Sequence, residues 1–293
     1  MQRLKESELI LTEDGRIYHL GLHPEDIGDY IITVGDPKRV ERVSMHFDKI
    51  ELKIQKREFV THTGMLGKKR ISVIGTGIGP DNIDIMINEI DALKNIDFKT
   101  RKIKKEFTKL NIIRMGTSGA LRKDIPVDSI VAASHGLGLD GLLNFYDFEK
   151  ESYHEEFNYK LKKELPELYE ICIPYIFEGS QRLLESVGKD YIHGITMTAG
   201  GFYGPQGREL RLKQKIHKII DHISDFNCLD HHITNFEMET SAIYGLAKLL
   251  GHEALSVNAI IANRATMEFS KDPYMFIDKM IVQTLEKIDD FGK

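Results

Sequence analysis

The sequence predicts an α/β fold with a largely parallel or mixed central sheet. Short β-branched runs that are bounded by glycine alternate along the chain with longer segments of helical periodicity. This alternation is typical of layered α/β proteins, whose ligands usually bind at the carboxyl ends of the strands. No repeat, low-complexity tract or Pro- and Ser-rich linker divides the chain, so we expect residues 1–293 to form a single domain.

The predicted elements follow in order. Five apolar runs read as buried strands that end in a turn: YIITVGDP (30–37), ISVIGTGIGP (71–80), LNIIRMGTSG (110–119), SIVAASHG (129–136) and ALSVNAIIANR (254–264). Helical periodicity predicts helices after GDP (KRVERVSMHF) and over 82–95, 236–251 and 272–291. The basic segment IDFKTRKIKKEFTKL (96–110) interrupts this alternation, and we expect it to be an insertion with a solvated helix or loop face.

Composition narrows the class of protein. Lys and Arg total 40 against 45 Asp and Glu, and a net charge of -5 argues against nucleic acid and anionic lipid as partners. No apolar run is long enough to span a membrane, and the N-terminal sequence lacks the apolar core of a signal peptide. Two cysteines are too few for a disulfide framework. The sequence therefore predicts a soluble cytoplasmic protein.

Two strand ends carry residues that suit an anion. GDPKR (35–39) precedes a predicted helix, so Arg39 and free backbone N–H groups would face the same point. Arg114 lies inside an apolar strand, where an unpaired guanidinium is costly to bury, and Thr117 follows it closely. Several guanidiniums match a phosphate dianion well, and Arg57 is a weaker third candidate. The alternatives are an ordinary turn at GDP and an internal salt bridge from Arg114 to a core carboxylate.

Two later segments carry polar groups that suit a base and a sugar. If FYGPQGREL (202–210) is extended, its amide and guanidinium point the same way, toward an imide edge and a carbonyl, and its Phe stacks on a ring. NFEMETSAIYG (235–245) places two carboxylates around Met238 at the start of a helix, where they would accept hydrogen bonds from a sugar diol. Each pattern has a simpler interpretation: a surface turn for the first, and helix N-terminal charge for the second.

Other chemistries find little support in the sequence. GTGIGP (75–80) matches neither the GxGxxG nor the GxxxxGK spacing, so a dinucleotide-dependent oxidoreductase is a weak alternative. The G-x-S-x-G, H-E-x-x-H and C-x-x-C patterns are absent. Histidine-rich stretches at 217–222 and 229–232 fit no zinc spacing, so we predict no metal site.

Read in order, eight segments closely resemble uridine phosphorylases, within the nucleoside phosphorylase superfamily: YHLGL (18–22), VGDPKRVERV (34–43), KREF (56–59), GTGIGP (75–80), IIRMGTSGAL (112–121), FYGPQGR (202–208), NFEMET (235–240) and IIANR (260–264). The resemblance implies a single-domain, three-layer α/β/α fold of the nucleoside phosphorylase type, with a central mixed, partly barrel-like sheet. It also implies a pentosyltransferase that converts uridine and phosphate reversibly to uracil and ribose 1-phosphate in pyrimidine nucleoside salvage. Phosphate would be a co-substrate, and no cofactor is expected.

The resemblance also assigns roles to individual residues. Those implied for phosphate are Gly35, Arg39, Arg57, Arg114 and Thr117. Those implied for the base are Phe202, Gln206, Arg208 and Arg264, and those for ribose are His19, Glu237, Met238 and Glu239. The residues expected to be catalytic are Arg39, Arg114, Gln206 and Arg208. Because His19 and Arg57 would reach a neighbouring subunit, a homo-oligomer, dimer or hexamer, with shared sites is expected.

The sequence departs from the relatives in two places and leaves alternatives open. GTGIGP is one residue shorter than the bacterial GIGGPS-type loop, and Asp81 stands near where a Ser is expected, so no bound cation is predicted. Segment 96–110 has no counterpart in compact bacterial members. Purine-specific enzymes carry a Ser-Asp element where this chain has Ala262, Asn263 and Arg264. A purine or broad-specificity nucleoside phosphorylase and a non-catalytic nucleoside-binding homologue remain the alternative functions.

Overall fold

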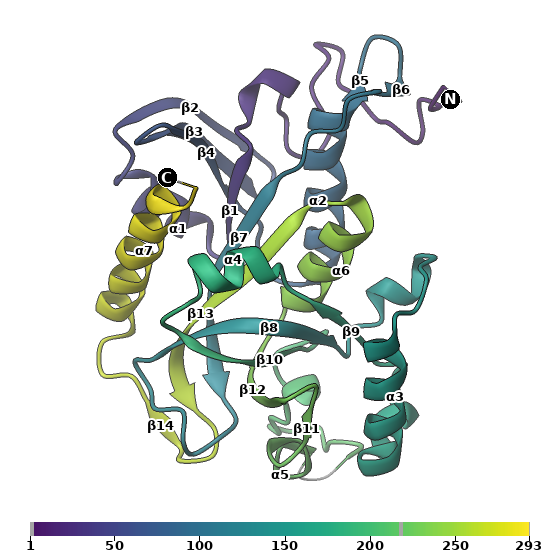
Figure 1. Cartoon of the computed structure of the whole chain (residues 1–293), viewed down its shortest axis with the longest axis vertical. Coiled ribbons are helices and arrows are strands. Elements are labelled where there is room, and N and C mark those ends of the chain that lie inside the picture. Colours follow the sequence, from purple (N-terminus) through teal and green to yellow (C-terminus); the bar gives the residue numbers. More distant parts are fainter. Residues whose placement is uncertain (1–2, 217–218, 293) are drawn as a thin grey trace.

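A computed structural model of the chain describes residues 3–216 and 219–292, whose main feature is one large mixed sheet (Figure 1). Its strands, in chain order, are β1 (Tyr30–Val34), β2 (Lys49–Lys56), β3 (Phe59–Leu66), β4 (Lys69–Gly75), β7 (Asn111–Ala120), β8 (Ile130–Gly138), β9 (Tyr175–Glu178), β10 (Ile192–Thr198), β11 (Asn227–Cys228), β12 (His231–Glu237), β13 (Glu253–Asn263) and β14 (Glu268–Phe269). A separate hairpin consists of β5 (Ile96–Asp97) and β6 (Lys102–Ile103).

Part of the sheet closes into a barrel. Strands β7, β13, β8, β10 and β12 pair in that order, and β12 returns to pair antiparallel with β7 through Asn235 and Phe236. On the other side of β7, the sheet continues through the parallel strands β1 and β4 and then the antiparallel strands β3 and β2. The expected mixed, partly barrel-like sheet is therefore confirmed.

Helices cover both faces of the sheet. They are α1 (Pro37–Ser44), α2 (Pro80–Asn95), α3 (Ser152–Glu164), α4 (Gln181–Ser186), α5 (Ile219–Ser224), α6 (Thr240–Leu250) and α7 (Pro273–Asp290). Figure 1 shows α2 and α6 on one side of the sheet and α1 and α7 on the other. Buried side chains of α2 and α6 belong to one apolar core, and those of α1, α4 and α7 belong to another. Helices α3 and α5 pack in a third core at the end of the barrel. This arrangement confirms the expected α/β/α layers.

The predicted strands and helices are found, and some of their ends are shifted: the helix expected to reach Phe47 ends at Ser44. The helix expected over 236–251 begins at Thr240, because residues up to Glu237 extend β12 and the Glu237 carboxylate accepts the N–H groups of Glu239 and Thr240. The carboxylate thus satisfies free donors at the helix start. This boundary places Glu237 at the end of a strand.

Segment 96–110 forms the partly exposed β5–β6 hairpin and a loop, so the loop alternative of the expectation is the one found. Figure 1 shows this hairpin beside the N-terminal segment. None of the helices in the described ranges has the length and apolar character needed to cross a membrane.

Candidate active site

A cavity of about 650 Å³ opens where β1, β4 and β7 end and the β12–α6 turn begins. Its walls come from segments far apart in the sequence, as expected for strand-end loops of an α/β sheet. The predicted residues among its lining are Gly35, Arg39, Arg114, Thr117, Phe202, Gln206, Arg208, Glu237, Met238 and Glu239. The structure therefore brings members of the predicted phosphate, base and ribose groups into a single cavity, while His19, Arg57 and Arg264 lie outside its lining.

Arg39 carries a buried positive charge that forms no ion pair with the carboxylates of residues 3–216 and 219–292. It lies in the first turn of α1, whose N-terminus is capped by Asp36. Its Nη1 donates to the carbonyl of Met115 over 3.2 Å, while its buried Nε has no hydrogen-bond partner among the described residues. Burial, and then the neighbouring charge of Arg114, lower the pKa of Arg39 to about 10. A bound anion would relieve both costs.

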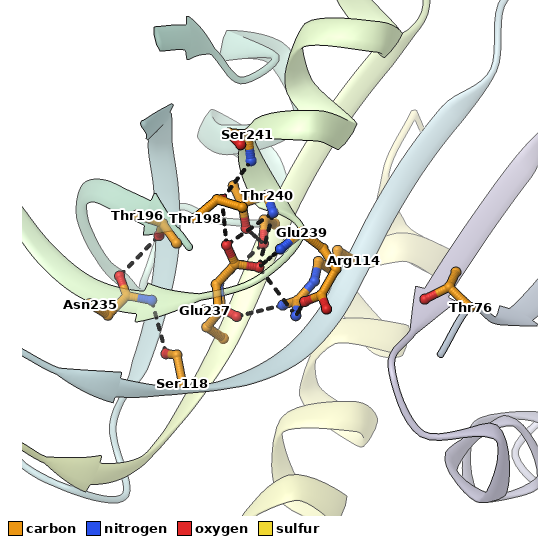
Figure 2. A network of polar contacts seen from close by, with 12 residues as sticks. Thr76, Arg114, Ser118, Thr196, Thr198, Asn235, Glu237, Glu239, Thr240 and Ser241 are labelled. Atoms are coloured by element: carbon orange, nitrogen blue, oxygen red, sulfur yellow. Dashed lines mark hydrogen bonds and ion pairs between the residues drawn. The ribbon is translucent and has the colours of Figure 1, made fainter. Parts of the chain in front are cut away.

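Arg114 is held by two buried carboxylates on the adjacent segment (Figure 2). Its Nη2 lies 3.2 Å from Oε2 of Glu237 and donates to Oε2 of Glu239, and its Nη1 donates to Oδ1 of Asn258 over 2.6 Å. Burial alone would lower the pKa of Arg114, but Glu237 and Glu239 raise it above its ordinary value. The internal salt bridge left open by the sequence is therefore present, and the same guanidinium also lines the cavity.

Gly116 leaves the space that the Arg114 side chain occupies. A Cβ atom at Gly116 would lie 1.6 Å from Nη1 of Arg114 and 2.7 Å from Oδ1 of Asn258. Neither atom can withdraw without breaking the hydrogen bond that joins them. The glycine in RMGTSG is therefore needed for close packing rather than for an unusual backbone angle.

The base-side residues lie on a tight turn, which the sequence left open, and not on an extended segment. Residues Gly204–Gln206 form one turn of 3-10 helix, and Gly207 follows with a φ of 67°. The turn still brings the two side chains together, because Nη1 of Arg208 donates to Oε1 of Gln206 over 2.6 Å. Gln206 is buried, while Arg208 is half-buried and stacks on the exposed ring of Phe202 at 3.8 Å.

Arg264 supports this turn from outside the cavity lining. Its Nη1 donates to the carbonyl of Gln206 over 3.0 Å, and its Nη2 donates to that of Gly207 over 3.3 Å. Asn263 is also committed to the backbone, since its amide donates to the carbonyls of Arg122 and Ile125. Both side chains of this predicted segment therefore shape loops around the cavity.

The carboxylates at the start of α6 have different surroundings. Glu237 accepts the hydroxyl of Thr198 over 2.7 Å, in addition to two N–H groups and Arg114. Burial raises the pKa of Glu237 against the opposing charge of Arg114. Glu239 accepts the N–H of Gly79 over 2.9 Å, and so connects Arg114 to the start of α2. Met238 lies between them in the cavity wall.

His19 and Arg57 lie together, but outside the lining of this cavity. Tyr18 joins them: its ring packs edge-on against His19 with centroids 4.9 Å apart, and the Arg57 guanidinium lies 5.0 Å from its centroid. Nη2 of Arg57 also donates to the Tyr18 hydroxyl over 3.0 Å. The two residues expected to serve a neighbouring subunit thus form one surface unit.

Sequence reasoning missed several groups that complete the site. Asn258 lies within β13 and Thr198 ends β10, and the signal for Asn258 was a polar residue in the apolar run SVNAIIA. The Gly79 N–H carried no side-chain signal at all. Among the described residues no group of three or more His, Cys, Asp or Glu side chains could hold a metal ion. His217, in the histidine-rich stretch 217–222, lies outside the described residues.

Comparison with known proteins shows the family to which the chain belongs. The profile of the phosphorylase superfamily matches residues 29–288. The chain is 30% identical over 272 residues to a uridine phosphorylase of Thermococcus kodakarensis, covering 92% of this chain and 86% of that protein. It is also 28% identical to a DeoD-type purine nucleoside phosphorylase of Geobacillus stearothermophilus, covering 82% and 83% of the two chains.

A solved structure has the same fold as this chain, although the two sequences differ at most positions. The crystal structure of a Trypanosoma brucei nucleoside phosphorylase, described as showing uridine phosphorylase activity, superposes with a TM-score of 0.87 at 27% identity. The superposition covers 95% of this chain and 98% of that one. With its arginine-lined cavity at the strand ends, the chain belongs to the phosphorylase superfamily as a pentosyltransferase-type enzyme that resembles uridine phosphorylases.

Proposed function

We propose that the protein catalyses the reversible phosphorolysis of uridine to uracil and ribose 1-phosphate. The observation that carries this proposal is the joint presence of Arg39 and Arg114 and of the Gln206–Arg208 pair in one cavity. Buried guanidiniums suit a phosphate dianion, and an amide beside a guanidinium suits the imide edge and carbonyl of uracil. Similarity to the uridine phosphorylases supports the same choice of base.

In this reaction phosphate attacks the anomeric carbon of the ribose while the bond to uracil nitrogen breaks. Arg39 and Arg114 would hold phosphate below that carbon, which orients the nucleophile and places negative charge beside the developing oxocarbenium ion. Uracil leaves with the bonding electron pair, and Arg208 would stabilise the negative charge on its carbonyl. The anomeric carbon is inverted, and no covalent enzyme intermediate is required.

Glu239 connects the phosphate and ribose parts of this proposal. Its carboxylate binds Arg114 and the Gly79 N–H in the ligand-free chain. When phosphate takes over part of the positive charge of Arg114, the carboxylate can accept hydrogen bonds from the ribose hydroxyls beside Met238. We therefore expect bound phosphate to strengthen nucleoside binding.

A second copy of the chain would complete the site. His19 and Arg57 lie outside the cavity of their own chain but share one surface unit with Tyr18. In a homo-oligomer this unit would bring Arg57 to the phosphate and His19 to the ribose 5′-hydroxyl of a neighbouring site. Three guanidiniums would then face the phosphate dianion.

A purine nucleoside phosphorylase is the second candidate, because DeoD-type purine enzymes are among the similar proteins. The cavity supports it less. The carboxylates among the residues that line it are Asp36, before α1, and Glu237 and Glu239, before α6. The side-chain amide of Asn263 already donates to the backbone carbonyls of Arg122 and Ile125. An acid that could protonate a purine ring beside Gln206 is absent from that lining.

The test is an assay of purified protein with uridine, with and without phosphate, followed by thymidine and inosine. Products are separated by chromatography and measured by ultraviolet absorbance. Uracil and ribose 1-phosphate that form only with phosphate would support the proposal, and uracil without phosphate would indicate hydrolysis. Preferred turnover of inosine would support the purine alternative, and binding without turnover of any nucleoside would support a non-catalytic homologue.

A further inference from the structure

We infer that Glu89 is a positioning residue that fixes the ring of His19 with Nδ1 protonated and leaves Nε2 as the hydrogen-bond acceptor for a ribose 5′-hydroxyl. This inference rests on the proposed function, because it concerns the same nucleoside site. Glu89 lies near the middle of α2, outside the residues that line the cavity. It would therefore act on the substrate only through His19.

The Glu89 carboxylate binds the His19 segment at four contacts. Its Oε1 lies 2.6 Å from Nδ1 of His19 and accepts the backbone N–H of His19 over 3.0 Å. Its Oε2 accepts the N–H of Leu20 over 2.8 Å and also that of His19 over 3.2 Å. Both oxygens of one carboxylate therefore hold the ring and its own backbone together.

These contacts select one tautomer of the neutral ring. An ionised carboxylate only accepts hydrogen bonds, so the His19 nitrogen beside Glu89 must carry the proton. The other nitrogen, Nε2, then has a lone pair and accepts a hydrogen bond. A ribose 5′-hydroxyl can donate that bond. The side-chain exposure of 26% for His19 against 12% for Glu89 agrees with a ring that faces outward from a covered carboxylate.

The rest of the N-terminal segment is anchored well enough for such positioning. Leu9, Ile17, Leu20 and Leu22 are buried in the core that includes α2. Arg101, in the β5–β6 hairpin, donates to the carbonyls of Leu4, Lys5 and Leu9, and its own carbonyl accepts the N–H of Leu4. Segment 96–110 therefore gives the segment that carries His19 a second attachment, in addition to Glu89.

The test compares substrates with and without the group that His19 is inferred to bind. We would measure kcat and KM of the Glu89→Gln variant for uridine and for 5′-deoxyuridine. A glutamine amide can donate to Nδ1 as well as accept from it, so the ring is no longer held in one tautomer. Loss of about one hydrogen bond should lower kcat/KM for uridine roughly tenfold, with little change for 5′-deoxyuridine. Equal losses for both substrates, or no loss, would overturn the inference.

Two further variants separate positioning from damage to the fold. In a His19→Gln background the Glu89→Gln change should have little additional effect, because Glu89 acts through His19. Arg101→Gly removes the hairpin attachment at a residue whose φ is 57°, a conformation that glycine adopts freely. It should also reduce turnover of uridine more than that of 5′-deoxyuridine. Glu13→Gln, which changes an exposed acid of the same segment, serves as the matched control.

A measurement of the His19 tautomer without substrate tests the role of Glu89 independently of the proposed function. Long-range proton–nitrogen NMR of histidine-labelled protein at alkaline pH reports which ring nitrogen of His19 is protonated, with assignment from His19→Gln. We expect a protonated Nδ1 in the unmodified protein and a mixture of tautomers in Glu89→Gln. A protonated Nε2 in the unmodified protein would overturn the inference even if uridine is a substrate. No turnover of any nucleoside by the unmodified protein would overturn the proposed function and the 5′-hydroxyl role, while the tautomer stays measurable.

Discussion

Nη1 of Arg208 lies 2.6 Å from the amide oxygen of Gln206, so the two side chains on the base side of the cavity are joined before any ligand binds. Burial, and then the nearby charge of Arg264, lower the pKa of Arg208 from its ordinary value. The guanidinium is therefore both oriented and poorly solvated. A group in this condition interacts more strongly with a negative charge that develops next to it.

Replacing Arg208 with alanine should lower kcat for uridine by about 10²-fold and change KM less, because uracil becomes negatively charged mainly in the transition state. Initial-rate kinetics at saturating phosphate measures both constants. Arg211→Ala, at an exposed arginine nearby, should leave them nearly unchanged. An increase in KM with an unaltered kcat would show that Arg208 contributes ground-state binding only.

Replacing Arg39 with methionine should raise the KM for phosphate by roughly 30-fold, because the change removes charged hydrogen-bond donors and keeps most of the side-chain volume. The free protein should lose little stability, since in the described part of the chain Arg39 donates to the Met115 carbonyl and its buried Nε has no hydrogen-bond partner. Arg42→Met on the same helix is the control, because Arg42 binds Asp278 and the Tyr274 carbonyl instead. Similar phosphate constants in both variants would contradict the assignment.

Replacing Gly116 with alanine should destabilise the fold by about 2–3 kcal/mol, because the added methyl group displaces Arg114 and Asn258. Urea unfolding followed by circular dichroism measures the free energy of unfolding. The matched change is Gly204→Ala, where a Cβ would meet nothing within 4 Å. Equal stability of the two variants would mean that the Arg114 side chain has room to move.

Acid should destabilise the fold through His135. Burial, and then the charges of His231, Lys248 and His154, lower the pKa of His135 to about 4. His135 therefore binds a proton near pH 6.5 in the unfolded chain but only near pH 4 in the folded chain. Because the unfolded state binds more protons between these values, the free energy of unfolding falls as the pH decreases through that window. Between pH 7 and pH 5 the loss from this residue is about 2 kcal/mol.

Urea unfolding at these two pH values measures the effect. The variant His135→Gln should show a smaller loss of stability between pH 7 and pH 5 than the unmodified protein. His46→Gln, which alters an exposed histidine, should keep the full loss. An identical pH dependence in all three proteins would assign the acid sensitivity to other groups.

The sequence predicted five apolar runs as strands, and it did not predict the more polar or shorter strands β2, β3, β9, β10 and β12. β2 (KIELKIQK) is largely exposed and pairs only with β3, so neither length nor apolar content distinguished it from a loop. Closure of the barrel depends on the pairing of Asn235 with Ala120 and of Phe236 with Gly119. Such contacts between distant residues leave no local periodicity, and the barrel was expected only from the family resemblance.

The site was predictable where a residue violated its local pattern. A charged Arg114 within an apolar strand required a partner, and the sequence could not decide between a ligand and a core carboxylate because both meet the same electrostatic need. The structure supplies Glu237 and Glu239. Glu89 gave no such signal, since a glutamate on a helix surface is ordinary until His19 is seen beside it.

Residues proposed for phosphate and ribose, on one side, and for the base, on the other, belong to parts of the chain with different architectural constraints. Arg114 and Glu237 lie on β7 and β12, two strands that the barrel joins by backbone hydrogen bonds. Gln206 and Arg208 lie on a short turn outside the strands, held by Arg264. Substitutions in the turn can therefore change the leaving group while the strands preserve the nucleophile, which gives evolution a way to diversify substrates without rebuilding the reaction.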